Sequence, residues 1–169
     1  ALITLVSVLE QNYMQQLLLW QMGSFSGRSW EQAGILAAVL IPGTLYLCRF
    51  SRQMDMMTFG EEAAQTMGVD TKRVKLKLIV AASLLTGTAV CFTGTIGFID
   101  LIAPHVARKV FGPAHKYALP VSVLFGGAFM VLADLAARTV MAPTELPVGA
   151  VTALIGAPFF AWVYFKEKA

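Results

Sequence analysis

The sequence contains little charge and little cysteine. Only 14% of its 169 residues are Asp, Glu, Lys or Arg, whereas 57% are hydrophobic. Soluble domains carry roughly 25% charged residues, so this chain has too few charges to cover a soluble globule of its length. Its two cysteines, Cys48 and Cys91, lie in apolar runs and lack the spacing of a disulfide framework or a zinc site. The composition also excludes a disordered chain and favours a protein surrounded by lipid.

Motifs that carry chemistry are also missing. The sequence has no G-x-x-x-x-G-K-[ST] phosphate-binding loop, so any nucleotide that drives this protein is expected to bind another chain. It also has no G-x-S-x-G, H-E-x-x-H or C-x-x-C, and its scattered His and Asp residues do not form a metal site. We therefore expect no catalytic residue, no metal, no cofactor and no nucleic-acid partner.

Long apolar runs dominate the chain instead. They predict an all-α, polytopic transmembrane helical bundle, because about 20 apolar residues span a bilayer as a helix. We expect five spans, at residues 34–48, 76–92, 96–111, 119–140 and 146–165. Residues 1–9 are apolar but too short to span, so they are interpreted as the end of a preceding span in a fragment. Small residues four apart, such as Ala133 and Ala137, are expected to allow close helix packing.

The basic residues predict the orientation of these spans. If the spans alternate, two basic residues, Arg28 and Arg138, lie on one side of the membrane. Eleven lie on the other: Arg49, Arg52, Lys72, Arg73, Lys75, Lys77, Arg108, Lys109, Lys116, Lys166 and Lys168. Cytoplasmic loops carry the excess of Lys and Arg. The second side, including the C-terminus, is therefore expected to be cytoplasmic, and residues 10–33 are expected to face outward.

Residues 49–77 form the one substantial polar region, which is expected to be a cytoplasmic loop. Thr58-Phe-Gly-Glu61 fits a capping box that begins a short helix, and Gly68 can end this helix in a left-handed conformation. Asp70 or Thr71 is expected to start the next helix. The loop also carries several large apolar side chains, namely Met54, Met56, Met57, Phe59 and Met67. These side chains could dock on a soluble partner, or they could rest on lipid headgroups or on the bundle itself.

Several polar residues are expected within or near hydrocarbon, where charge is costly and suggests function. Asp134 and Arg138 lie four residues apart on one helix face and are expected to form a structural ion pair. His105 is interpreted as a packing residue, although Asp100, His105 and Asp134 could also form the proton relay of a secondary transporter. In the last span, small residues and a bend midway along it, near Gly156, are consistent with a transport pathway or with plain packing.

Five groups of residues together resemble the FecCD family. They are Gly23-Ser-Phe-Ser-Gly27; Phe59-Gly-Glu-Glu-Ala-Ala-Gln-Thr-Met-Gly68; Gly94-Thr-Ile-Gly-Phe98 with Ala103-Pro-His-Val-Ala-Arg108; Ala133-Asp-Leu-Ala-Ala-Arg138; and Ala142-Pro-Thr-Glu-Leu-Pro-Val-Gly149 with Thr152-Ala-Leu-Ile-Gly-Ala-Pro-Phe159. Members of this family are permease subunits of bacterial ABC importers for ferric siderophores, haem, cobalamin and related metal chelates. The resemblance implies that residues 1–169 are one transmembrane permease domain, the C-terminal half of a ten-span inner-membrane permease.

The resemblance also implies partners and roles. The partners would be an ABC ATPase subunit, a periplasmic or lipid-anchored substrate-binding protein near residues 10–33, and a second permease copy or homologue. Within the loop at residues 49–77, the residues that couple to the ATPase would be Met56, Phe59, Gly60, Glu61, Glu62, Ala63 and Gly68. The pathway would be lined by Glu145, Pro147, Gly149, Thr152 and Gly156. Family members often have a small residue where this chain has Asp100.

Overall fold

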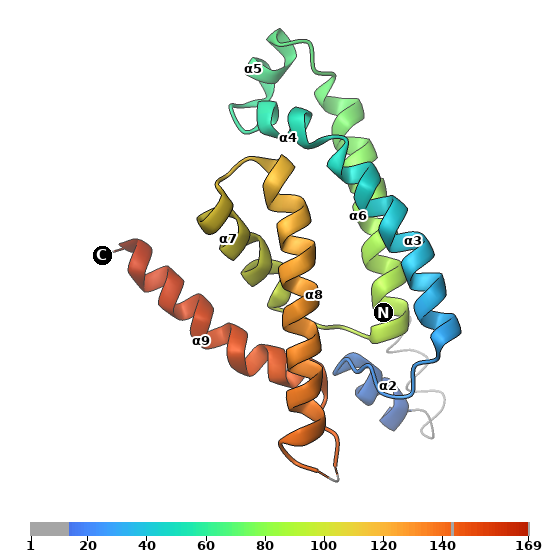
Figure 1. The fold of residues 1–169 in the computed structure, drawn as a ribbon. Helices are drawn as coiled ribbons and strands as arrows, with labels where there is room; N and C mark the ends of the chain where they lie inside the picture. Colours follow the sequence, from blue (N-terminus) through green and yellow to red (C-terminus); the bar gives the residue numbers. More distant parts are fainter. Residues whose placement is uncertain (1–13, 143, 169) are drawn as a thin grey trace.

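The computed structural model describes residues 14–142 and 144–168 (Figure 1). Within these ranges every regular element is a helix, which confirms the predicted all-α class. In chain order the helices are α2 (Met14–Gln21), α3 (Trp30–Cys48), α4 (Ser51–Met57), α5 (Glu61–Thr66), α6 (Thr71–Thr93), α7 (Ile99–Phe111), α8 (His115–Thr139) and α9 (Val148–Lys168). The span end expected at residues 1–9 lies outside the described residues.

Three of the described helices, α3, α6 and α8, are long and apolar enough to cross a membrane. The apolar part of α9 is shorter, at Val148–Val163. Helix α7 has 13 residues and is therefore about 20 Å long, compared with a hydrocarbon core of about 30 Å. Each predicted span thus coincides with a helix. Helix α7, which corresponds to the third predicted span, begins at Ile99 rather than at residue 96.

Polar side chains set the helix starts at α3 and α6. Ser29 accepts a hydrogen bond from the backbone N–H of Gln32, and the Gln32 side chain accepts one from the N–H of Ser29, both at 3.3 Å. This capping box starts α3 at Trp30, four residues before the predicted start. Asp70 accepts from the N–H of Arg73 at 3.1 Å, so the predicted cap of α6 is confirmed.

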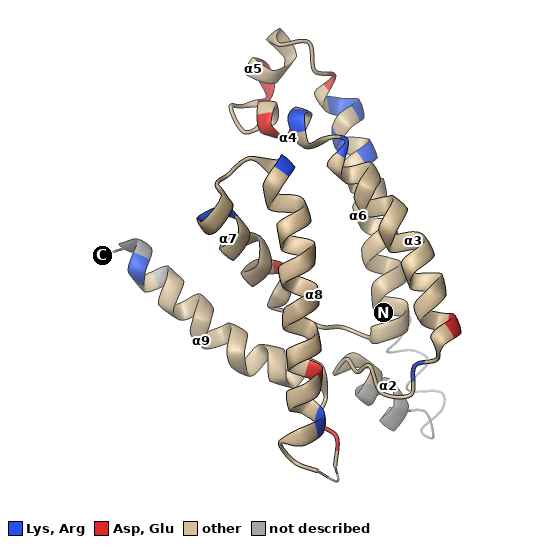
Figure 2. Ribbon diagram, in the orientation of Figure 1, with Lys and Arg blue, Asp and Glu red and all other residues tan. Residues whose placement is uncertain are grey.

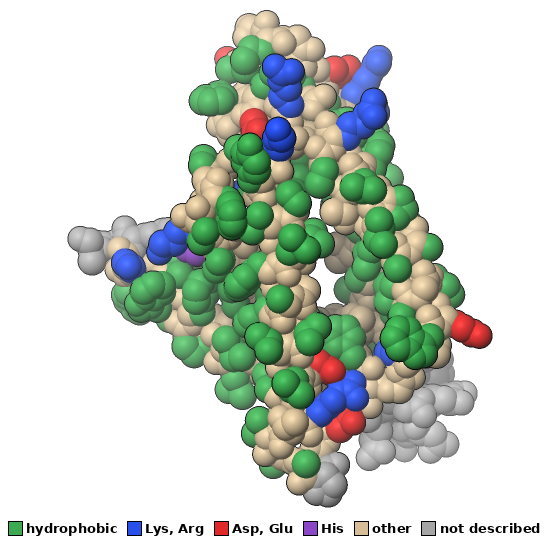
Figure 3. Space-filling model, viewed as in Figure 1, with side chains coloured by type: hydrophobic (Ala, Val, Ile, Leu, Met, Phe, Trp, Pro, Cys, Tyr) green, Lys and Arg blue, Asp and Glu red, His purple; other side chains and the backbone are tan. Residues whose placement is uncertain are grey.

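Small residues form the contacts between the helices. Helix α7 packs on α8 through the buried Ala103 and Ala107, and Gly126 of α8 faces Ala103. Ala133 and Ala137 are buried in a second contact with Val148 of α9, as their spacing predicted. Large apolar side chains, in contrast, cover much of the surface (Figure 3), and Leu124 and Leu154 are 73% and 75% exposed. Such a surface is typical of a chain that faces lipid or other protein.

Charge separates the two ends of the molecule. The end formed by α4 and α5, here called the loop end, carries basic side chains where α3 ends and α6 begins (Figure 2). The opposite end contains the connection from α8 to α9 and the turn after α2, with Arg28 and Arg138 as its basic residues. The three long apolar helices, α3, α6 and α8, therefore run between a basic end and an end with few basic residues.

The non-helical residues 94–98 connect α6 with α7. They pack closely against the backbone of residues 20–24. Gly94 has a φ of 73°, and a Cβ at this position would collide with the carbonyl oxygen of Trp20. The N–H of Ser24 donates to the carbonyl of Thr93 at 2.9 Å, and the hydroxyl of Thr95 donates to the carbonyl of Gln21. These contacts give polar groups of the non-helical segment partners within the protein.

Replacing Gly94 with Ala is therefore expected to lower the free energy of unfolding by about 2 to 4 kcal/mol, through left-handed strain and the collision with Trp20. Unfolding of the detergent-solubilised protein measures this loss. Gly87→Ala, in the adjoining helix α6, is the matched control, because nothing lies within 4 Å of a Cβ there. It should change stability by no more than about 1 kcal/mol. Equal stability of the two variants would contradict the close packing of residues 94–98.

Candidate functional site

The loop end has a small hydrophobic core of its own. Ala64, Val69 and Val74 are buried together, and four half-buried side chains pack against them, namely Phe50, Met56, Met57 and Leu78. The sequence left open whether the methionines dock on a partner or on the protein itself. Met56 and Met57 pack against the protein itself, which makes α4, α5 and the start of α6 one packed unit.

The turn between α4 and α5 differs from the predicted capping box. The hydroxyl of Thr58 donates to the carbonyl of Asp55 at 2.7 Å and so closes the end of α4. The N-cap of α5 is Gly60, with a φ of 106° and no side-chain cap. The capping-box prediction was wrong because α4, which the sequence did not reveal as a separate helix, takes the Thr58 hydroxyl for its own last turn.

The predicted end of this helix at Gly68 is confirmed. Gly68 has a φ of 85°. Its N–H donates to the carbonyl of Gln65 at 2.9 Å, and the N–H of Val69 donates to that of Ala64 at 3.0 Å. This pattern is a Schellman motif, which favours glycine at the left-handed position. It turns the chain so that Val69 joins Ala64 of α5 in the small core.

An exposed apolar side chain beside two carboxylates marks the outer surface of the loop end. Phe59 is 78% exposed. Glu61 and Glu62 follow it in the first turn of α5, where carboxylates interact favourably with the helix dipole. Glu61 also forms an ion pair with Lys75 of α6, which fastens α5 to the following helix. Phe59 therefore lies exposed between the last turn of α4 and the first turn of α5.

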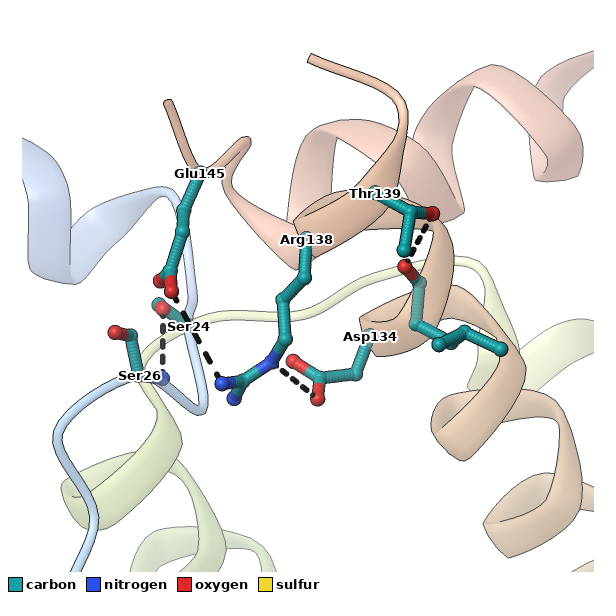
Figure 4. A network of polar contacts seen from close by, with 7 residues as sticks. Ser24, Ser26, Asp134, Arg138, Thr139 and Glu145 are labelled. Carbon is teal, nitrogen blue, oxygen red and sulfur yellow. Dashed lines mark hydrogen bonds and ion pairs between the residues drawn. The ribbon is translucent and has the colours of Figure 1, made fainter. Parts of the chain in front are cut away.

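The opposite end holds the predicted ion pair. Nε of Arg138 lies 2.8 Å from a carboxylate oxygen of Asp134, and Nη1 lies 4.0 Å from Glu145 (Figure 4). Arg138 thus bridges the last turn of α8 and the connection to α9. Glu145 and Pro147 line a pocket of about 470 Å³ together with Trp20, Ser24, Ser26, Arg28, Thr93 and Leu146.

The other three predicted pathway residues face protein in this chain. Thr152 is fully buried and its hydroxyl donates to the carbonyl of Gly149 at 3.0 Å. A Cβ on Gly149 would collide with the carbonyl of Met22, and one on Gly156 would collide with the side chain of Phe98. These residues therefore bring α9 against residues 94–98 and the turn after α2.

Asp100 and His105 lie in a groove between α7 and α9 that the sequence did not predict. The groove has a volume of about 720 Å³ and is also lined by Arg108, Lys109, Trp162 and Lys166. The His105 ring meets the ring of Phe159 edge-on at 6.0 Å. Among the residues that the structure describes, no hydrogen bond joins Asp100, His105 and Asp134, and no group of three His, Cys, Asp or Glu could hold a metal.

Known proteins share both the sequence and this arrangement of helices. The chain is 40% identical over 167 residues to the uncharacterized ABC transporter permease protein YvrB of Bacillus subtilis (strain 168), covering 99% of this chain and 47% of that protein. It is 47% identical over 144 residues to the cobalamin import system permease protein BtuC of Halobacterium salinarum, covering 85% of this chain and 38% of that protein.

A solved structure is similar as well. It is an inward-facing conformation of a protein assigned to the metal-chelate type of ABC transporters. It superposes with a TM-score of 0.92 at 29% identity, over 98% of this chain and 54% of that one. The chain thus spans about half the length of these relatives. The model of the FecCD transport family matches residues 1–166, and the chain therefore belongs to the FecCD transport family.

Proposed function

We propose that this chain is part of the membrane permease of an ABC importer that moves a metal chelate, such as a ferric siderophore, haem or cobalamin. A separate ATPase subunit supplies the energy. The family, the relative that imports cobalamin and the metal-chelate type of the similar structure support this class of cargo. The bacterial inner membrane would be its location, with the loop end and the C-terminus in the cytoplasm, in agreement with the basic residues there.

The exposed Phe59 beside Glu61 and Glu62 is the observation that carries the proposal. Phe59 and Met67, 78% and 49% exposed, leave two large apolar side chains uncovered at the polar end of a membrane protein, which favours contact with another protein. The small core around Met56, together with the left-handed Gly60 and Gly68, holds this surface in shape. Ala63, in the first half of α5, is half-buried. We infer that an ATPase subunit binds here and that its movement displaces α4 and α5 together.

The opposite end would receive the cargo. A substrate-binding protein would dock beside the pocket that Glu145 and Pro147 line, and the pathway would run along α9 toward a second permease copy or homologue. The tight packing of Gly149, Thr152 and Gly156 against neighbouring backbone supports a positioning role for these residues. They would fix α9, and with it the wall of the pathway, relative to residues 94–98.

Replacing Phe59 with Ala is expected to reduce ATP-driven uptake at least about tenfold, because buried aromatic anchors commonly contribute more than 2 kcal/mol to an interface. Co-purification of the ATPase subunit with the full-length permease, together with uptake into proteoliposomes, measures the effect. Stability should change little, since the side chain is exposed in the chain alone.

The matched control for Phe59→Ala is Trp30→Ala. Trp30 is a second aromatic side chain, 93% exposed, at the end of α3 that is far from the loop end. This variant should retain the ATPase subunit. If Phe59→Ala and Trp30→Ala bind the ATPase equally well, Phe59 is not part of a coupling surface.

Asp100→Asn is expected to leave ATP-driven uptake within about twofold of the parent and insensitive to a protonophore, because a permease driven by ATP needs no titrating carboxylate. Uptake into proteoliposomes with and without the protonophore measures this. Loss of uptake in the variant, together with collapse of parental uptake on adding the protonophore, would favour the proton-coupled transporter instead.

A further inference from the structure

Helix α4 of the loop end lies against the beginning of α8, although the two are far apart in the sequence (Figure 1). Asp55 of α4 and His115, the first residue of α8, make this contact. One carboxylate oxygen of Asp55 accepts a hydrogen bond from the backbone N–H of His115 at 2.9 Å and lies 2.6 Å from Nδ1 of its ring. Since an ionised carboxylate only accepts, Nδ1 carries the proton in this contact.

This carboxylate occupies the place of a helix cap. The first N–H groups of a helix have no partner within the helix and are commonly satisfied by a side chain just before it. The residue before His115 is Ala114, which offers no such side chain. Asp55, 60 residues earlier, supplies the acceptor and places a negative charge at the positive end of the α8 dipole.

Burial raises the pKa of Asp55, but the hydrogen bonds from the backbone and the ring of His115 outweigh this, so its pKa lies below the usual value. The carboxylate is therefore ionised above an ordinary aspartate pKa of about 3.9, and its contribution to stability is lost only as the pH falls through the lower, folded-state value. The His115 side chain is 15% exposed and that of Asp55 38% exposed. The hydrogen bonds between Asp55 and His115 are thus charge-assisted and partly shielded from water.

Helix α8 carries this contact to the other end of the molecule. Its 25 residues correspond to a length of about 37 Å. Its far end holds Asp134 and Arg138, and the N–H of Leu146 donates to the carbonyl of Ala137 at 3.0 Å. Helix α4 continues covalently into α3 and toward α5 but not into α8, so noncovalent contacts alone join α4 to α8.

We propose that Asp55 and His115 are positioning residues that make α4 and α8 move as one body, so that a displacement of the loop end reaches the opposite end through α8. This inference rests on the proposed function, in which an ATPase subunit displaces the loop end. It assigns the transmission step to one contact between two helices, distinct from the surface around Phe59 that binds the ATPase.

The test uses the full-length permease reconstituted with its ATPase subunit and binding protein. Asp55→Ala should still co-purify with the ATPase and hydrolyse ATP, while the cargo moved per ATP falls about tenfold, the size of a typical coupling between sites. Asp55→Asn keeps an acceptor oxygen, and His115→Ala keeps the backbone N–H, so each should lose less. If Asp55→Ala is not recovered from the membrane, Asp55→Asn and His115→Ala test the inference instead. A purely structural role would leave the amount of cargo moved per ATP unchanged in these two variants.

Asp70→Ala is the matched control, since Asp70 is a carboxylate of the same loop that caps its own helix. It should keep the parental ratio. Spin labels at the exposed Met67 and Leu124 give a second readout, and Asp55→Ala should broaden the distance distribution between them. Parental ratios and distances in Asp55→Ala and Asp55→Asn would overturn this inference while leaving the proposed function intact. Failure of the parent to bind any ATPase subunit would instead overturn the proposed function.

Discussion

In hydrocarbon, each backbone N–H and C=O needs a partner within the protein, and this constraint governs where the chain is helical and where it is not. Helices satisfy it by themselves. Residues 94–98 do not form a helix, and they lie among the turn after α2 and the first half of α9. Glycines at positions 23, 94 and 149 allow the backbones to approach there. The positions of α6, α7 and α9 relative to one another therefore depend on this one packed segment.

The sequence predicted the features that rest on local signals. Apolar runs located the helices, Gly68 and Asp70 marked a helix end and a helix start, and the spacing of Asp134 and Arg138 indicated their ion pair. It failed where the deciding partner is distant. Thr58 closes α4 instead of starting α5, because α4 is a separate helix that the sequence did not reveal, and α4 itself contacts the distant α8 through Asp55 and His115. A contact across 60 residues leaves no periodicity or motif in a single sequence.

Small residues in the last helix illustrate a different limit. Their spacing indicated that something approaches α9 closely, but spacing carries no information about what approaches. The structure places the turn after α2 against Gly149 and Phe98 against Gly156. Glu145 and Pro147, by contrast, precede the tightly packed part of the helix and line an open pocket. Residues that line a pocket and residues that pack tightly thus occupy successive parts of one segment, and only their three-dimensional neighbours distinguish the two groups.

The network at the opposite end has two contacts that respond differently to movement. Arg138 and Asp134 belong to the same helix, so their 2.8 Å contact is preserved when α8 moves as a body. Glu145 belongs to the connection between α8 and α9, and its 4.0 Å separation from Arg138 depends on how the two helices lie. Asp134 therefore holds the guanidinium in place, while the distance to Glu145 changes with the geometry. A displacement delivered along α8 would consequently change the separation of the Arg138 and Glu145 charges beside the pocket without unfolding either helix.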